Sequence, residues 1–174
     1  MNIICEKAVS VAVRWIMAAA ILSIIPSEPR AESLRCPSLR ISFLADSNFH
    51  GASFDAYLAD DASERSAGLM GFGSFPKHQA MLFDFTRERE VGFWMKNTLI
   101  PLDMIFLSRE GKIVKIHGNA IPHDETTIRS PFPVRYVLEI NGGLSRQLGL
   151  TEGLQARSAD LPEKYSAGRF CLNQ

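Results

Sequence analysis

The sequence contains little cysteine. It has three cysteines in 174 residues, and no two of them form a C-x-x-C motif, which argues against a thioredoxin-like redox site or a cysteine-rich zinc site. Cys5 lies in the N-terminal segment, residues 1–31, which we predict below to be a cleaved signal peptide. The mature chain then keeps two cysteines, Cys36 and Cys171. In an exported protein such an even pair is typical of a disulfide. We therefore predict a bridge between Cys36 and Cys171.

The sequence also lacks an excess of either charge. Residues 32–174 contain 16 Lys and Arg residues against 17 Asp and Glu residues. A nearly neutral chain has no electrostatic footprint for nucleic acid or for an anionic membrane. Neither is expected as a partner.

No apolar run is long enough to span a bilayer. The longest, Trp15–Ile25, has 11 residues, whereas a transmembrane helix needs about 20. Lys7 and Arg14 precede it, and the small residue Ala31 follows, which is the pattern of a secretory signal peptide. We predict that residues 1–31 are removed and that the protein is periplasmic or secreted, with no stable membrane span after cleavage. Retention of this segment as an anchor is the alternative.

Motifs for nucleophilic or cofactor-dependent catalysis are missing. There is no G-x-S-x-G elbow, no H-x-H or H-E-x-x-H metal motif, and Gly71-Phe72-Gly73 is not followed by the Lys-Ser of a phosphate loop. No cofactor is expected, and an enzyme is a minority hypothesis.

The chain does contain many short apolar segments punctuated by Gly and Pro, a pattern typical of short strands with tight turns. The strands we predict are Leu39–Ala45, Phe54–Ala59, Gln79–Phe85, Val91–Thr98, Leu102–Leu107, Lys112–His117, Val134–Asn141 and Leu154–Arg157. Thr86–Glu90 and Ser108–Gly111 are predicted as turns, the second of them in a hairpin.

Two short helices complete the expected fold. Asp61 and Glu64 form a capping-box pattern at the start of a helix that ends near Met70, and Leu144–Leu148 is a second short helix. Residues 32–174 are then one compact α+β domain, mostly β, of short antiparallel strands in a barrel or sandwich.

The segment Gly92–Met104, GFWMKNTLIPLDM, places Lys96, Asn97 and Asp103 within an otherwise apolar run. Buried polar groups are costly unless something satisfies them, so this segment marks a candidate site. If it begins as a strand, alternation puts Trp94 and Lys96 on one face and Asn97 on the other. Lys96 is then the better ligand contact, with Asp103 as its counter-charge, and Asn97 is a candidate for shaping the following turn.

Further ionisable residues lie within predicted strands. Arg135 and Glu139 share one strand, and His117, a residue type that often shuttles protons, lies on another. Aromatic walls with a few convergent polar groups are typical of small-ligand sites. The candidate ligand-binding residues are Trp94, Lys96, Asn97, Asp103, Arg135 and Glu139. Structural ion pairs, such as Arg135 with Glu139, are the alternative.

Two other functions stay open. A hydrolase-like enzyme could use Lys96, Asp103 and Glu139, since two carboxylates in a cleft suit glycoside-type chemistry. A minor alternative is Cu(I) binding, because every methionine after residue 31 falls within 35 residues and thioethers are soft ligands. Methionine is a routine core filler, however, so core packing is the expected role of Met70, Met81, Met95 and Met104.

Several ordered motifs resemble the DUF192 (UPF0127) family. They are Arg65-Ser66-Ala67-Gly68-Leu69-Met70, Met81-Leu82-Phe83, Phe93-Trp94-Met95-Lys96-Asn97-Thr98, Ile100-Pro101-Leu102-Asp103-Met104, Gly111-Lys112-Ile113-Val114, Asn119-Ala120, Pro133-Val134-Arg135, Glu139-Ile140-Asn141-Gly142-Gly143 and Leu148-Gly149. The resemblance covers about residues 55–157. It implies a compact, β-rich fold in a family that often follows a signal peptide and has no agreed biochemical function.

The chain departs from the family pattern in three places. Phe72 stands where an arginine is common, Ala80 where a glycine precedes Met-Leu-Phe, and Leu154 where an aspartate is usual. If a charged rim contributes to a common ligand site, the loss of the arginine and the aspartate changes the ligand preference of that site. The expected function is an exported small-ligand-binding or envelope accessory protein, whose partner is a small molecule or an envelope component.

Overall fold

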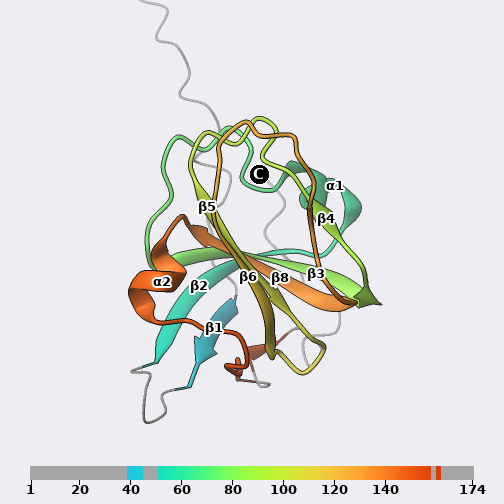
Figure 1. Ribbon diagram of the computed structural model, residues 1–174, viewed down its shortest axis with the longest axis vertical. Coiled ribbons are helices and arrows are strands. Elements are labelled where there is room, and N and C mark those ends of the chain that lie inside the picture. The colour runs from blue at the N-terminus through green and yellow to red at the C-terminus, as the bar shows by residue number, and fades with distance from the viewer. Residues whose placement is uncertain (1–38, 45–50, 158–159, 162–174) are drawn as a thin grey trace, which may run out of the picture.

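The computed structural model describes residues 39–44, 51–157 and 160–161 (Figure 1). The strands are β1 (Leu39–Phe43), β2 (Ala52–Ala59), β3 (Gln79–Arg89), β4 (Gly92–Phe93), β5 (Leu102–Leu107), β6 (Ile113–Ala120), β7 (Ile128–Arg129) and β8 (Val134–Asn141), and the helices are α1 (Ala62–Ala67) and α2 (Leu144–Leu148). The expected fold class, mostly β with two short helices, is confirmed.

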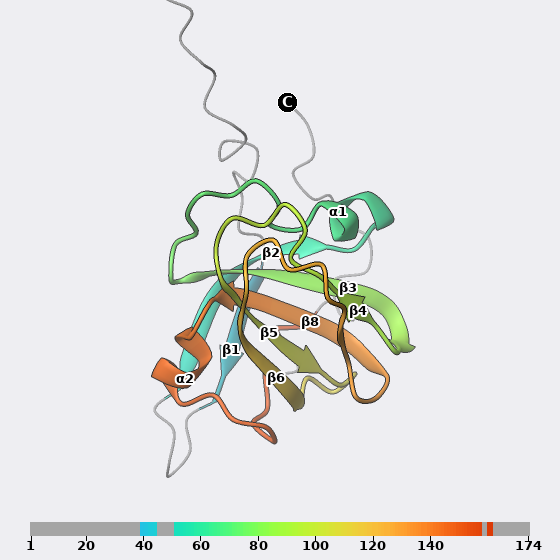
Figure 2. The same ribbon diagram turned by 45° about the horizontal axis from the view of Figure 1, so that its top comes forward.

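Six strands form one curved, open sheet in the order β1-β2-β3-β8-β5-β6, and β4 pairs with β7 in a small second sheet (Figures 1 and 2). All neighbours in the large sheet are antiparallel except β2 and β3, which are parallel. The parallel pair departs from the antiparallel prediction because the connection from β2 to β3 contains α1 and crosses over, instead of turning back in a hairpin.

Apolar side chains are buried on both faces of the large sheet. The face that α2 covers holds Ile41, Phe54, Leu82, Ile105, Tyr136, Leu138, Ile140 and Leu144, among others. The opposite face lies under the loops between β2 and β3, between β4 and β5, and between β6 and β8; we call it the loop-covered face. Its buried residues include Tyr57, Leu69, Phe75, Met81, Phe83, Met95, Leu102, Met104, Phe106 and Val137.

The segment 153–157 connects the two edges of the large sheet. Ala156 forms an isolated bridge with Phe43 of β1, and Gln155 forms another with Lys112 just before β6. The predicted strand Leu154–Arg157 is therefore reduced to these two bridges. The Ile113 amide donates to the Leu154 carbonyl at 2.9 Å and the Gly153 amide donates to the Ile113 carbonyl at 2.8 Å, and these bonds fix the segment to β6.

Helix α1 begins where the capping pattern predicts. The Asp61 carboxylate accepts a hydrogen bond from the Glu64 amide at 2.8 Å, and the Glu64 carboxylate accepts one from the Asp61 amide at 3.4 Å. The helix ends at Ala67 instead of Met70, because Gly68 takes a positive φ of 46° there. Helix α2 has the predicted bounds.

Two strand predictions were wrong. Strand β3 continues to Arg89 through the expected turn at Thr86–Glu90, since Thr86 adopts a positive φ of 65° and forms an irregularity without ending the strand. The predicted strand Val91–Thr98 is only two residues long, Gly92–Phe93, and the chain then turns.

Residues 1–38 and 162–174 lie outside the described part of the chain. The predicted signal peptide, Cys36 and Cys171 all fall there, so their predictions stay untested. In the described ranges, no helix combines the length and apolarity needed to cross a bilayer.

Candidate functional site

The segment expected to be a strand with Lys96 and Asn97 on opposite faces is a tight turn. The Thr98 amide donates to the Met95 carbonyl at 3.0 Å, and Asn97 has a positive φ of 54°. Asparagine tolerates this left-handed backbone better than most residues. The prediction that Asn97 shapes a turn is therefore confirmed, although the turn comes earlier than Pro101.

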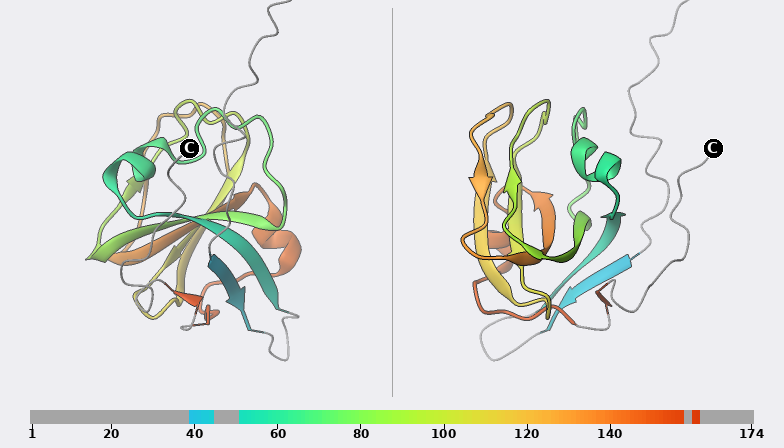
Figure 3. Two further views of the ribbon diagram at one scale, coloured as in Figure 1. Left: turned by 180° about the vertical axis from the view of Figure 1, so that it is seen from behind. Right: turned by 90° about the vertical axis from the view of Figure 1, so that its right-hand side faces the viewer.

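Three loops meet around this turn. The Gly71 amide donates to the Asn97 carbonyl at 2.9 Å, and the Met95 amide donates to the Asp124 carbonyl at 2.8 Å. The His123 amide in turn donates to the Met95 carbonyl at 3.0 Å. The loops containing residues 68–78, 94–101 and 121–127 consequently lie side by side at one end of the molecule, the top in Figure 3.

Trp94 and Lys96 flank the buried Met95 at this end. Trp94 is 47% exposed, and the Lys96 ammonium lies 5.1 Å from the centre of the indole ring. This is a cation–π contact of the kind found at partly exposed sites. Met95 is fully buried in the loop-covered core, so it holds both neighbours above that face of the sheet.

Asp103 is buried and already satisfied. One carboxylate oxygen accepts from the amides of Asn119 at 2.6 Å and Gly143 at 2.7 Å. The other accepts from the Ser145 amide at 2.8 Å and the Ser145 hydroxyl at 2.6 Å. The carboxylate thus joins β5 to the end of β6 and to the start of α2.

The expected ion pair between Lys96 and Asp103 is not formed. Asp103 lies opposite Ile140 of β8, on the face that α2 covers, whereas Met104 beside it belongs to the loop-covered face. Strand geometry sends adjacent side chains to opposite faces. Asp103 therefore stabilises the fold on the far side of the sheet from the Trp94–Lys96 turn.

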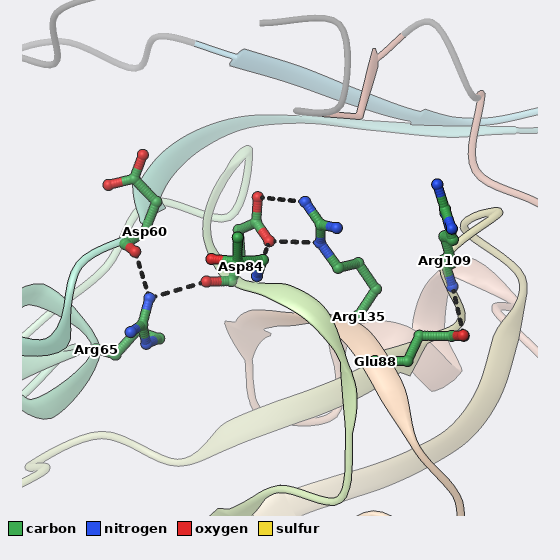
Figure 4. Close-up of polar contacts among 7 residues, drawn as sticks. Asp60, Arg65, Asp84, Glu88, Arg109 and Arg135 are labelled. Carbon is green, nitrogen blue, oxygen red and sulfur yellow. Dashed lines mark hydrogen bonds and ion pairs between the residues drawn. The ribbon is translucent and has the colours of Figure 1, made fainter. Parts of the chain in front are cut away.

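Arg135 pairs with Asp84, an acid outside the set of predicted site residues. Its guanidinium donates to both carboxylate oxygens of Asp84, at 2.6 Å and 3.2 Å, and both side chains are about nine-tenths buried (Figure 4). The expected pair of Arg135 with Glu139 is replaced by this bidentate bridge between β8 and β3. A lone Asp in the apolar segment Gln79–Phe85 was the signal that could have indicated it.

Arg65 reinforces the same region from α1. Its guanidinium donates to the Asp84 carbonyl at 2.9 Å and also to the Asp60 carbonyl (Figure 4). The Thr86 amide donates to the Asp84 carboxylate at 2.7 Å, which holds the irregular part of β3 in place. Asp84, Arg65 and Arg135 form a structural connection between α1, β3 and β8.

Glu139 differs from both of these acids. It is only 4% exposed, yet in the described part of the chain no hydrogen bond or ion pair reaches its carboxyl group. Burial raises the pKa of Glu139 from 4.5 to about 8, because removal from water disfavours the charged form. At neutral pH the group is mostly an uncharged carboxylic acid.

The strand register places Glu139 in the middle of a row on the loop-covered face. Met81 of β3 and Met104 of β5 lie directly opposite it on its two sides. Beyond them, Tyr57 of β2 is opposite Met81 and His117 of β6 is opposite Met104. The row therefore reads Tyr57, Met81, Glu139, Met104, His117 across five neighbouring strands.

The methionines are segregated to this face. Met81, Met95 and Met104 are all at most 5% exposed and belong to the loop-covered core, which confirms that they pack in the interior. Met70 is half-buried in the adjoining loop. Within the described ranges no three His, Cys, Asp or Glu residues are grouped so that they could hold a metal.

The structure therefore divides the six candidate residues. Trp94, Lys96 and Asn97 lie at the turn, and Glu139 lies on the sheet face that the turn covers. Asp103 and Arg135 belong to structural networks elsewhere. Asp103 and Glu139 are on opposite faces of the sheet, so a catalytic site with two facing carboxylates is not formed.

Of the three departures from the family pattern, Phe72 has a clear contact. Its ring packs edge-on against Phe75, with centroids 6.3 Å apart, beside the loop-covered core. An apolar ring thus stands at the rim where an arginine is common.

Comparisons with known proteins agree with the fold. The profile of a family described as "Uncharacterized ACR" matches residues 45–157. A structure of a protein of unknown function from Novosphingobium aromaticivorans is 34% identical, with a TM-score of 0.64, and the match covers 68% of this chain and 83% of that one. A structure from Sinorhizobium meliloti, described provisionally as a transcription regulator, is 42% identical, with a TM-score of 0.65, and the match covers 71% and 95%. No curated protein matches significantly.

Proposed function

Because this chain belongs to the DUF192 family, whose members have no agreed activity, we propose its function from the site itself: it is an exported ligand-binding protein. The ligand is held on the loop-covered face, with Glu139 as the group that recognises it. The Trp94–Lys96 turn lies at the rim of this face.

The observation that carries the proposal is the contrast among the buried acids. Three carboxyl groups are buried in the described residues, namely Asp84, Asp103 and Glu139. Asp84 pairs with Arg135, and Asp103 accepts four hydrogen bonds. Only Glu139 has neither kind of partner among the described residues.

An acid that is nearly buried, as Glu139 is at 4% exposure, and that has no protein partner among the described residues opposes folding. Placing a carboxyl group in an apolar core without a hydrogen bond costs on the order of a few kcal/mol. A Leu or Met at this position of β8 would pack between Met81 and Met104 without that cost. Strongly shifted acids without a structural partner are candidates for function, so we take the missing partner of Glu139 to be a ligand.

The covering loops place polar and aromatic groups beside the loop-covered face. Trp94 is exposed beside the buried Met95, and backbone hydrogen bonds to neighbouring loops fix the turn that holds both. Leu69, Phe75 and Met95 anchor these loops in the core, and loops on a rigid scaffold are where binding residues are often found. Lys96 on this turn supplies a positive charge at the rim.

A thermal-shift panel tests ligand binding. Organic acids, amines, amino acids, sugars and metal salts are each added to the wild-type protein and to Glu139→Gln, an isosteric change. Glu110→Gln, on an exposed acid, is the matched control. We expect at least one compound to raise the Tm of the wild type and of Glu110→Gln but not of Glu139→Gln. If every stabilising compound acts equally on Glu139→Gln, or none stabilises the wild type, the proposal is wrong.

Export is tested separately. The basic residues and apolar run before residue 31 motivate it. Expression of the full chain in a bacterium, followed by N-terminal sequencing of the periplasmic fraction, is expected to find a protein that starts close to Glu32. A product that stays in the cytoplasm with an intact N-terminus would contradict export.

A further inference from the structure

The two residues that flank Glu139 in the sheet are both methionines. In antiparallel pairs, the Cα atoms of directly opposite residues are about 4.5 to 5.5 Å apart and their side chains point to the same face. Met81 and Met104 are both opposite Glu139 in antiparallel pairs. Their thioethers therefore stand on either side of the carboxyl group, on the face that the loops cover.

We infer that Met81, Glu139 and Met104 form a binding site for a soft monovalent cation, Cu(I) or Ag(I). This inference rests on the proposed function, because it identifies the ligand that Glu139 binds. The two sulfur atoms and one carboxylate oxygen are the ligands. Thioethers are the uncharged side chains that such ions prefer, whereas Ca²⁺ and Mg²⁺ require oxygen ligands.

A cation suits the charge of the site. In the described part of the chain neither Lys nor Arg pairs with Glu139, since Arg135 is bound to Asp84 and Lys96 lies over Trp94. Glu139 is mostly uncharged at neutral pH, so a bound cation displaces its proton and then neutralises the carboxylate within the apolar core. An anionic ligand cannot displace that proton, and it would itself be a buried charge without a counter-ion.

The small exposure of the site favours an ion over an organic molecule. Met81 is 5% exposed, Glu139 is 4% exposed and Met104 is fully buried. A metal ion needs only a narrow entry, whereas a drug-sized ligand occupies a cleft of about 300 Å³ or more. The exposed edges of Met81 and Glu139 provide that entry.

His117 extends the row on the other side of Met104. It is half-buried, and imidazole is a common ligand for copper. It lies directly opposite Met104 on β6. We assign it an outer position next to Met104, on the side of the site away from the entry at Met81 and Glu139.

Core packing alone does not account for this arrangement. The face that α2 covers is filled by Ile, Leu, Phe, Tyr and Ala without a single buried methionine, whereas the loop-covered face contains three. Methionine fills irregular spaces well, but packing gives no reason for an acid between two of them that has no partner in the described part of the chain. Metal binding explains the acid and its neighbours together.

Silver titration tests the inference. Silver nitrate is added to the full, processed protein by isothermal titration calorimetry in chloride-free buffer, because Ag(I) needs no reductant and so leaves any disulfide intact. Thiols are alkylated beforehand, so that Cys36 and Cys171 do not contribute. The double variant Met81→Leu/Met104→Leu removes both sulfurs at nearly constant volume, and Met70→Leu, half-buried in the adjoining loop, is the control.

We expect one silver ion per wild-type chain, a similar affinity for Met70→Leu, and at least about a tenfold loss of affinity in the double variant. If the double variant does not fold, X-ray absorption of the wild-type silver complex decides the question, since sulfur neighbours are expected around the ion. Absence of tight silver binding, equal binding by the double variant, or only nitrogen and oxygen neighbours would overturn the inference.

The two proposals fail in different ways. If silver does not bind but an organic compound stabilises the wild type and not Glu139→Gln, the metal inference is wrong and the ligand-binding proposal stands. If no ligand of any class distinguishes Glu139→Gln from the wild type, both are wrong.

Discussion

The carboxylate of Asp103 binds Ser145 twice, accepting from its amide at 2.8 Å and from its hydroxyl at 2.6 Å. Ser145 is the second residue of α2, a helix of only five residues whose first residue, Leu144, packs in the core. A helix this short has little stability of its own. The buried acid on β5 therefore holds α2 against the sheet.

Asp103→Asn is expected to lower the free energy of unfolding by about 2 to 4 kcal/mol, because the amide leaves buried donors without an acceptor. Asp124→Asn, on an exposed acid that accepts from the Thr126 amide, is expected to change it much less. Urea denaturation of both variants measures the difference. If Asp103→Asn is as stable as the control but loses ligand binding, Asp103 belongs to the site after all.

The buried pair of Asp84 and Arg135 can be compared with an exposed pair in the same sheet. Arg40 and Asp55 are 2.9 Å apart, but their side chains are 68% and 31% exposed. Double-mutant cycles with Asp→Asn and Arg→Met at each pair are expected to give a coupling energy of more than about 1 kcal/mol for the buried pair and less than about 1 kcal/mol for the exposed one. Equal coupling energies would show that the Asp84–Arg135 bridge does not hold β3 to β8.

Glu139 makes stability depend on pH in a direction opposite to that of a salt-bridged acid. The unfolded chain releases this proton above its ordinary pKa of 4.5, whereas the folded protein keeps it until a pKa of about 8. The free energy of unfolding should therefore fall between pH 4.5 and 8, by at most about 1.4 kcal/mol per pH unit, and level off above.

The comparison with Glu139→Gln isolates this effect. The other residues of the row are identical in both proteins, so the difference between the two curves reports on Glu139 alone. Urea denaturation from pH 4 to 9 is expected to show the variant gaining stability relative to the wild type as pH rises. A difference that is independent of pH would mean that Glu139 is not desolvated.

Asn97 tests whether the turn positions Trp94 and Lys96. Its φ of 54° is costly for most residues with a Cβ atom, so Asn97→Ala is expected to lose about 1 kcal/mol of stability, whereas Asn97→Gly loses less. Thermal unfolding measures both. An alanine variant more stable than the glycine variant would argue against a left-handed backbone at this position.

The sequence was most informative where one physical rule acts alone. Val134–Asn141 alternates cleanly and forms β8 with those bounds, and the capping pair Asp61 and Glu64 starts α1 as expected. Gly111, with a φ of 85°, forms the predicted hairpin turn between β5 and β6. Each of these features depends on residues that are near one another in the chain.

Features that depend on distant residues could not be predicted in this way. The Val91–Thr98 alternation predicted a strand, but backbone bonds from Gly71 and to Asp124 favour a turn. Likewise, Asp103 pairs with amides 16 to 42 residues away, and Arg135 pairs with an acid 51 residues away. Which polar residues share a face follows from strand order, and nothing in a single sequence specifies that order.

The central claim is that Glu139 is a buried acid without a hydrogen-bond or ion-pair partner among the described residues. The most direct measurement is an NMR titration of its side-chain carboxyl carbon, assigned by comparison with Glu139→Gln. We predict a midpoint near pH 8, well separated from the other glutamates. A midpoint between about pH 4 and 5, as in an exposed glutamate, would contradict the account.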